Sequence, residues 1–308
     1  MNSSTNFSVQ NEIPYENWFI PIDILVIVCI CIGIVLSLIF FLTILFDKTC
    51  HTVPMMLTGN SCLLGFIFGL LILNMRIFTL KNDFYRSDSI DLFCSFRGYF
   101  GYALCSIQNC SYLLQAIYRL ILVIYPNRLI FQSMKFQFLL IILTYLFGLF
   151  YPLIFLLDGE IIYNVHNQIC QLPLKLSFSI IYMANFAYIT PVSCTIITYF
   201  ILVFYVKKMS HCVVSLNNLN RAKRELKMVR RTVILVSILV ILCFPYALLI
   251  FLSFFISIPI YHFRIAYVFL DVAYLFVILV LYQFTDQLQL SITKKIKRQS
   301  TQIMPTVT

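Results

Sequence analysis

Residues 24–46 read ILVIVCICIGIVLSLIFFLTILF, a run of 23 residues that contains no formal charge. A bilayer core of ~30 Å is crossed by about 20 apolar residues in a helix, so this run can span a membrane. Six further segments are similarly long and apolar. Helices are the economical interpretation because backbone polar groups in lipid must be satisfied within their own segment. We therefore predict seven transmembrane helices, at about residues 20–46, 52–77, 91–124, 134–157, 176–206, 226–257 and 262–285.

The composition agrees with a membrane protein. Of the 308 residues, 61% are hydrophobic and 11% are charged, whereas a soluble domain carries roughly 25% charged residues. Beyond the last span, Leu288, Ile292 and Ile296 recur every four residues beside a basic cluster, which is typical of a helix lying on the membrane surface. The predicted fold class is an all-α membrane protein, a seven-transmembrane helix bundle followed by a short amphipathic helix.

The net charge of +10 indicates membrane topology and not nucleic-acid binding. With the N-terminus outside, most basic residues lie at or near the cytoplasmic side, as the positive-inside rule requires. We expect an extracellular segment 1–19, a transmembrane domain 20–285 and a cytoplasmic helix and tail 286–308, in the plasma membrane. Asn2 and Asn6 begin Asn-x-Ser triplets outside and are candidate glycosylation sites. The sixteen basic residues on the cytoplasmic side are Lys48, Arg119, Arg128, Lys135, Lys207, Lys208, Arg221, Lys223, Arg224, Lys227, Arg230, Arg231, Lys294, Lys295, Lys297 and Arg298.

Residues at the ends and bends of the spans fall into a common register. Cys94 lies at the outer end of the third span and Arg119 at its inner end, which places the arginine 119 − 94 = 25 positions after the cysteine. This register resembles that of the rhodopsin-like (class A) G-protein-coupled receptors over roughly residues 20–298. The other positions that match are Pro152, Cys170, Pro191, Tyr199, Glu225, the Cys243-Phe-Pro245-Tyr246 region and Tyr282.

The resemblance implies a cell-surface receptor that binds an extracellular ligand, either a small molecule or a peptide. Such a receptor activates a heterotrimeric G protein by outward movement of its sixth helix, and it needs no cofactor. The resemblance also implies a disulfide between Cys94 and Cys170 on the oxidising face.

The same resemblance assigns roles at the inner end. Arg119 is expected to pair with Glu225 in the inactive state, and breaking such a contact is the kind of two-state event that signalling requires. Tyr199 and Tyr282 resemble the tyrosines that meet this arginine in the active state. Pro152, Pro191 and Pro245 interrupt helical hydrogen bonds and are candidate hinges.

Several positions depart from the family pattern. Gly65 stands where the family has a buried aspartate, and the seventh span reads Ile278-Leu-Val-Leu-Tyr282 without the usual Asn and Pro. Tyr118 replaces the acid before Arg119, which removes one restraint and predicts raised basal activity. These departures leave an alternative open, a seven-helix chemosensory or scaffolding membrane protein without G-protein coupling.

The ligand pocket has a few candidate residues. Asp271 is an acid inside a span, which is costly and indicates function. It either binds a cationic group of the ligand or pairs with Arg97. The acid of amine receptors would fall at Gly101, so a usual amine pocket is not expected. Cys243 and Tyr246 complete the candidate set. Asp83, Asp88, Asp91, Asp158 and Glu160 form an acidic outer rim that either steers a basic peptide or is merely solvated.

Other classes of protein fit the sequence poorly. All four histidines, His51, His166, His211 and His262, fall in loops or at span ends. No cluster inside the membrane is therefore expected to bind a metal or to activate a nucleophile, and we predict that the chain is not an enzyme. A transporter would be expected to show repeat symmetry and matching broken helices, and neither pattern is visible.

Overall fold

The computed structural model describes residues 18–85, 93–173, 177–211, 261–285 and 288–293, with scattered positions between 237 and 256. Six helices in these residues are long and apolar enough to cross a membrane. The sixth expected span, about 226–257, lies mostly outside the described residues, although its described positions from 237 to 252 are helical. The protein is a multi-pass integral membrane protein of the expected helical class.

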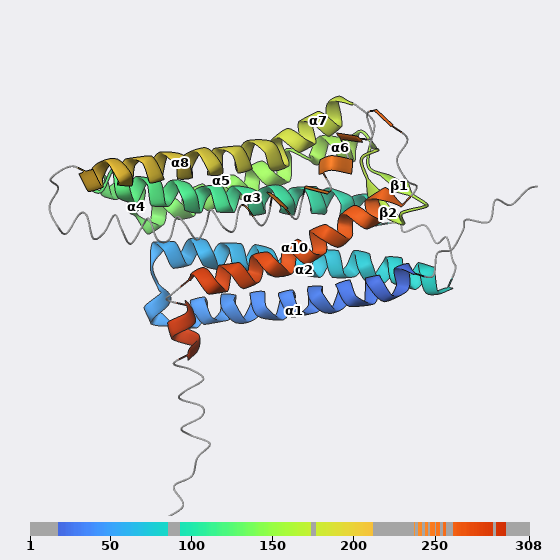
Figure 1. Ribbon diagram of the computed structural model, residues 1–308, viewed down its shortest axis with the longest axis horizontal. Helices are drawn as coiled ribbons and strands as arrows, with labels where there is room; N and C mark the ends of the chain where they lie inside the picture. Colours follow the sequence, from blue (N-terminus) through green and yellow to red (C-terminus); the bar gives the residue numbers. More distant parts are fainter. Residues whose placement is uncertain are drawn as a thin grey trace, which may run out of the picture.

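The helices lie side by side along the longest axis of the molecule (Figure 1). In that view α1 (Phe19–Phe46), α2 (Val53–Tyr85) and α10 (His262–Phe284) form one group. A second group contains α3 (Cys94–Ile124), α5 (Met134–Phe150) and α8 (Thr190–His211), and α2 packs against α3. The shorter elements are η1 (Lys48–Cys50), α4 (Leu129–Gln132), α6 (Leu153–Leu157), β1 (Ile162–Asn164), β2 (Ile169–Gln171), α7 (Phe178–Ala184) and η2 (Asn185–Ile189).

Helix α1 is apolar on all sides, but only one stripe of it packs against protein. Val26, Ile30 and Phe40 are buried at helical spacing, whereas Leu25 and Val35 on the other faces are exposed. A soluble helix would place polar residues on those exposed faces. The exposed apolar side chains are therefore lipid-facing.

Several polar side chains between the helices are paired with one another. Ser61 and Ser111 share a hydrogen bond of 2.7 Å, and Gln115 donates to the Ser61 hydroxyl at 2.7 Å. The Tyr145 hydroxyl donates to the Asn60 carboxamide oxygen at 3.0 Å. Because no water is available in the bilayer core to satisfy such groups, this pairing links α2, α3 and α5.

A tyrosine on α10 determines how closely three helices approach. A Cβ atom at Gly33 would lie 2.5 Å from Tyr274 Cε1, and one at Gly69 would contact the Tyr274 hydroxyl. That hydroxyl donates to the Gly65 carbonyl at 3.0 Å. Gly33 and Gly69 thus leave the space that Tyr274 fills between α1 and α2. A Cβ atom at Gly65, where the resemblance would place an aspartate, would lie 2.9 Å from Ile278 Cδ1.

Two of the expected spans are interrupted at a proline. The fourth span breaks between α5 and α6 at Tyr151 and Pro152. The fifth contains the π-helical turn η2 immediately before Thr190 and Pro191. Proline has no N–H to donate four residues back, so the Ala187 carbonyl cannot receive that bond. The buried Asn109 side chain on α3 donates to this oxygen at 2.8 Å. Pro245 is at a helical position.

Two helices extend past their expected ends, and the segment after the seventh span packs differently from the expectation. Helix α8 continues to His211, past the expected end at residue 206. Helix α2 continues to Tyr85, well past the expected end at residue 77. Beyond the seventh span, residues 288–293 are helical as expected. However, Leu288 is completely buried and the Ser291 hydroxyl donates to Asp47, so this turn packs against the bundle.

Candidate functional site

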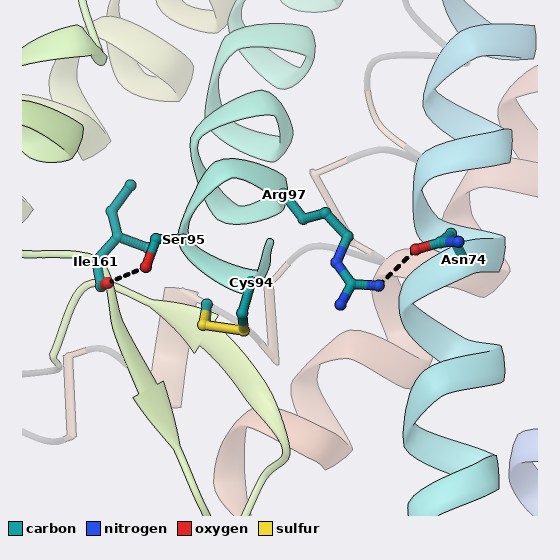
Figure 2. The surroundings of a disulfide bond; sticks show 6 residues. Asn74, Cys94, Ser95, Arg97 and Ile161 are labelled. Atoms are coloured by element: carbon teal, nitrogen blue, oxygen red, sulfur yellow. Dashed lines mark hydrogen bonds between the residues drawn. A yellow bond between two sulfur atoms is a disulfide. The ribbon is translucent and has the colours of Figure 1, made fainter. Parts of the chain in front are cut away.

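A disulfide between Cys94 and Cys170 marks one end of the bundle, here called the disulfide end (Figure 2). It joins the first residue of α3 to the centre of β2, with the two Cα atoms 5.4 Å apart. The β1–β2 hairpin is antiparallel, with Tyr163 opposite Cys170. The Ser95 hydroxyl also donates to the Ile161 carbonyl at 2.9 Å. The hairpin is thus fixed against the start of α3 by the pairing that the resemblance implies.

Arg76 on α2 connects α1 and α10. Its Nε donates to Asp271 on α10 at 2.6 Å, and its Nη1 donates to Asp23 on α1 at 3.1 Å. The Arg76 side chain is 4% exposed, and those of Asp271 and Asp23 are 2% and 0% exposed. Arg76 therefore bridges three helices from inside the bundle.

Arg264 on α10 makes the second bridge. Its Nη2 donates to Asp23 at 2.7 Å and also contacts Asp83 on α2, to which Nη1 donates at 3.2 Å. The side chain of Gln168, in the loop between β1 and β2, donates to Asp83 at 3.1 Å. The Arg264 guanidinium also lies 4.3 Å from the centre of the Phe19 ring.

These contacts form a continuous ladder of alternating charges, from Asp83 through Arg264, Asp23 and Arg76 to Asp271. We call these five residues the ion ladder. All five are buried. Ionised groups away from water are stable only when they are paired and hydrogen-bonded, and the ion ladder pairs each member across helices. It therefore ties α1, α2 and α10 together near the disulfide end.

Four members of the ion ladder, Asp23, Arg76, Asp83 and Arg264, were not predicted from the sequence to pair inside the bundle. Asp83 was expected on an acidic outer rim that either steers a basic peptide or is solvated, and neither interpretation fits because Asp83 is only 7% exposed and paired with Arg264. Asp158 is exposed, as the rim interpretation requires. A usable signal did exist: Arg76 and Asp83 lie seven residues apart on one helix, as do Arg264 and Asp271 on another. Seven residues are two helical turns, so each pair shares a face.

Arg97 does not pair with Asp271, in contrast to one of the two expectations. Its Nη1 lies 2.5 Å from the Asn74 carboxamide oxygen on α2. Figure 2 shows Arg97 directed toward Asn74. Its guanidinium carbon also lies 5.0 Å from the centre of the Phe78 ring. Arg76, two residues before Phe78 and therefore on the other side of α2, takes the Asp271 carboxylate instead, because it projects from the buried face of that helix.

Open space lies beside Gly101 on α3. A Cβ atom built at Gly101 would meet no atom of the described residues within 4 Å. On the next position of α3, the Tyr102 hydroxyl accepts a hydrogen bond from the Leu172 N–H at 3.1 Å. On α10, the Tyr267 hydroxyl lies 3.4 Å from the side-chain oxygen of Gln171. Since Gln171 and Leu172 are neighbours, α3 and α10 face each other beneath the same short segment.

At the opposite end of α3, Tyr118 is buried with Leu57, Leu114 and Ile141. Arg119 is half-buried beside it. Tyr199 on α8 packs in a cluster with Ala116, one turn of α3 before Arg119. Tyr282 lies elsewhere, stacked on the Phe40 ring of α1 with ring centres 5.0 Å apart. The described structure therefore places Tyr199, but not Tyr282, against α3 near the arginine.

Several predicted residues lie outside the described part of the chain. They are Asn2 and Asn6, Glu225, and Cys243 and Tyr246. Asp88 and Asp91 of the expected rim also lie there, so the rim keeps only Asp158 and the half-buried Glu160.

The fold is similar to that of a solved structure. The chain superposes on squid rhodopsin with a TM-score of 0.75 and 15% sequence identity, covering 99% of this chain and 94% of that one. No protein-family model matches the sequence. No curated protein matches it either. The chain thus has the fold of rhodopsin, as the register of motifs predicts.

Proposed function

We propose that this protein is a cell-surface receptor that binds an extracellular ligand and activates a heterotrimeric G protein. The observation that carries the proposal is the agreement between two independent features. The whole chain follows the rhodopsin fold, and its third helix carries the disulfide at one end and Arg119 near the other. At 1.5 Å per residue, the 25 residues between Cys94 and Arg119 extend about 37 Å, which separates the two ends by a membrane thickness.

The disulfide end is the proposed extracellular, ligand-binding end. Disulfides form in oxidising compartments, and basic residues such as Arg128 and Lys207 cluster at the other end, as the positive-inside rule expects of the cytoplasm. The N-terminus would then be outside and the C-terminus inside. Removal of N-linked glycans should increase the mobility of the wild type on a gel but not that of an Asn2→Gln/Asn6→Gln variant. A wild type without glycans would leave this orientation without that support.

The proposed ligand site lies between α3 and α10, beneath the hairpin that the disulfide holds. Gly101 borders open space there, and Asp271 lies in the buried part of α10. A pocket of this kind suits a small molecule or the end of a peptide, because the described hairpin covers the ends of the helices. Arg97, Cys243 and Tyr246 remain candidate contacts of the ligand.

The opposite end is the proposed coupling surface. Arg119 would pair with Glu225 at rest and bind the G protein after the sixth helix moves outward. Tyr199 packs against Ala116, one turn of α3 before Arg119. From there it can contact Arg119 once the pair with Glu225 is broken. Tyr118 supplies no carboxylate to restrain Arg119, so we expect basal activity above that of a receptor with an acid there. Tyr118→Asp should lower it at matched surface levels, although burial of the new carboxylate will also reduce stability.

The test is basal second-messenger output in cells that express wild type, Arg119→Ala and Glu225→Ala at matched surface levels. Cyclic AMP, calcium and inositol phosphate are measured together because the proposal does not specify the class of G protein. We expect the wild type to signal above untransfected cells, Arg119→Ala to abolish the signal and Glu225→Ala to raise it. A signal that is unchanged in both variants would contradict the coupling role. It would favour the chemosensory or scaffolding alternative, to which the altered positions Gly65 and Tyr118 also point.

A further inference from the structure

Asp271 has the fewest hydrogen bonds among the three carboxylates of the ion ladder. Asp23 accepts from both arginines, and Asp83 accepts from Arg264 and Gln168. Asp271 accepts one bond, from Arg76 Nε. A carboxylate offers about four acceptor positions. The Asp271 side chain is only 2% exposed, so little water can reach the positions that protein leaves open.

The guanidinium of Arg76 leaves a donor unused at the same place. Its Nη2 atom is buried and has no hydrogen-bond partner among the described residues. A guanidinium presents Nε and one terminal nitrogen along a common edge. A carboxylate can accept a hydrogen bond from each of them with its two oxygens. Asp271 contacts Nε alone. One oxygen of Asp271 is therefore available to a further donor.

The formal charges of the ion ladder do not balance. It contains three carboxylates and two guanidinium groups, which leaves one negative charge in excess. An uncompensated charge inside a membrane protein is costly. Asp271 is the end of the ion ladder with a single arginine contact, so a further positive charge is best placed beside it.

The described residues also leave open space beside α3, at Gly101. Arg97 and Gly101 lie four residues apart on α3 and so share a face. Arg97 reaches Asn74 on α2, so this face is directed toward the helix that carries Arg76. Gly101 borders the open space. Asp271 lies one turn along α10 from Tyr267, whose hydroxyl is beneath the hairpin. The open space and the under-coordinated carboxylate thus belong to the same part of the bundle.

We infer that Asp271 binds the cationic group of the ligand, a protonated amine, which supplies the positive charge that the ion ladder lacks. Arg76 is a positioning residue that holds Asp271 through Nε. The inference rests on the proposed function, since it names the class of ligand for the same site. It differs from the usual amine pocket of the resembled family, whose acid would stand at Gly101.

The test uses the full chain in lipid nanodiscs, with thermal unfolding as the readout. The probes are 2-phenylethylamine, tyramine and 1,5-diaminopentane, each paired with its neutral alcohol: 2-phenylethanol, tyrosol and 1,5-pentanediol. We expect at least one amine to raise the melting temperature of the wild type while its alcohol does not. Asp271→Asn should weaken the apparent affinity for that amine by at least about tenfold. Asp158→Asn, which changes an exposed acid, should leave it unchanged.

The ligand-free proteins give a second, independent measurement. Asparagine at 271 keeps an oxygen that can accept from Arg76 Nε but removes the excess charge. The melting temperature of ligand-free Asp271→Asn should therefore equal or exceed that of the wild type. A lower one would show that Asp271 is needed for structure alone, and would overturn the inference. So would amines that act no better than alcohols in the wild type, which is the result expected if a proton alone satisfies Asp271.

This experiment separates the inference from the proposed function, because unfolding needs no G protein. Binding of an amine through Asp271 without any effect on G-protein activity would support the inference and contradict the receptor proposal. G-protein activation that is unaffected by Asp271→Asn, together with equal melting-temperature shifts from amines and alcohols, would support the receptor proposal and contradict the inference.

Discussion

The side chain of Asn109 on α3 donates a hydrogen bond of 2.8 Å to the carbonyl oxygen of Ala187, across the interface between two transmembrane segments. Pro191 is four residues after Ala187 and has no N–H, so the usual helical donor to this oxygen is missing. The contact therefore replaces, from another helix, a bond that the proline removes. It also fixes the π-helical turn Asn185–Ile189 against α3.

We predict that Asn109 and Pro191 are energetically coupled. Asn109→Leu should destabilise the protein by roughly 1–2 kcal/mol, because it leaves a buried carbonyl without that donor. In a Pro191→Ala background the restored N–H can donate to Ala187, so the same change should cost less. A double-mutant cycle of unfolding free energies measures the difference. Equal costs in the two backgrounds would exclude this compensation.

Asp23 should be the most sensitive member of the ion ladder. It is completely buried and binds both Arg76 and Arg264. Asp23→Asn leaves Arg76 paired only with Asp271 and Arg264 only with Asp83. Its amide nitrogen cannot accept from the second guanidinium, and loss of one partner of a buried ion pair costs about 3–5 kcal/mol. The melting temperature in nanodiscs should fall far more than for Asp158→Asn. Similar small effects of the two variants would mean that the ion ladder contributes little to stability.

Gly98 and Gly101 lie on the same helix, so alanine substitutions at the two positions can be compared directly. A Cβ atom at Gly98 would lie 2.7 Å from the carbonyl oxygen of Cys170, a backbone atom that the disulfide holds in place. At Gly101 it would meet nothing within 4 Å in the part of the chain that the structure describes. Gly98→Ala should therefore lower the melting temperature, whereas Gly101→Ala should raise it slightly, since alanine favours a helix over glycine by about 1 kcal/mol. The opposite order would contradict the packing of β2 against α3.

The disulfide should stabilise the disulfide end. It closes a loop with a sequence separation of 76 residues, for which the chain-entropy model gives on the order of 4 kcal/mol. Cys94→Ser, Cys170→Ser and the double variant should lower the melting temperature by similar amounts, because each removes the same bond. Cys31→Ser is the control, since Cys31 is a free, exposed cysteine on α1. Clearly additive losses would indicate separate roles for the two cysteines.

The sequence predicted the transmembrane helices well where lipid contact dictates composition. Helix α1 begins at Phe19 and ends at Phe46, within one residue of the expected span, because nearly all of its residues are apolar. Helix α2 was predicted too short. Arg76 and Asp83 ended the apolar run, yet both are buried because their partners lie on other helices. Local hydropathy contains no information about such partners.

In the candidate site too, some features could be predicted from the sequence and others could not. The Cys94–Cys170 pairing and the placement of Arg119 at the end of α3 follow from the register of motifs. The pairing of Asp271 with Arg76 instead of Arg97 depends on which faces α2 and α3 present to α10, and spacing along one helix does not determine this. The contact of Asn109 with Ala187 was also not anticipated, although a polar residue in a span opposite a proline is a pattern that could be searched for.

The central claim is that this fold activates a G protein through Arg119. The most direct measurement is nucleotide exchange on a panel of purified heterotrimers, with wild type or Arg119→Ala in nanodiscs. Similar melting temperatures of the two proteins serve as the folding control. We predict that the wild type accelerates exchange on at least one heterotrimer, and that Arg119→Ala returns the rate to that of empty nanodiscs. A wild type that leaves every rate unchanged, or an Arg119→Ala variant as active as the wild type, would contradict the account.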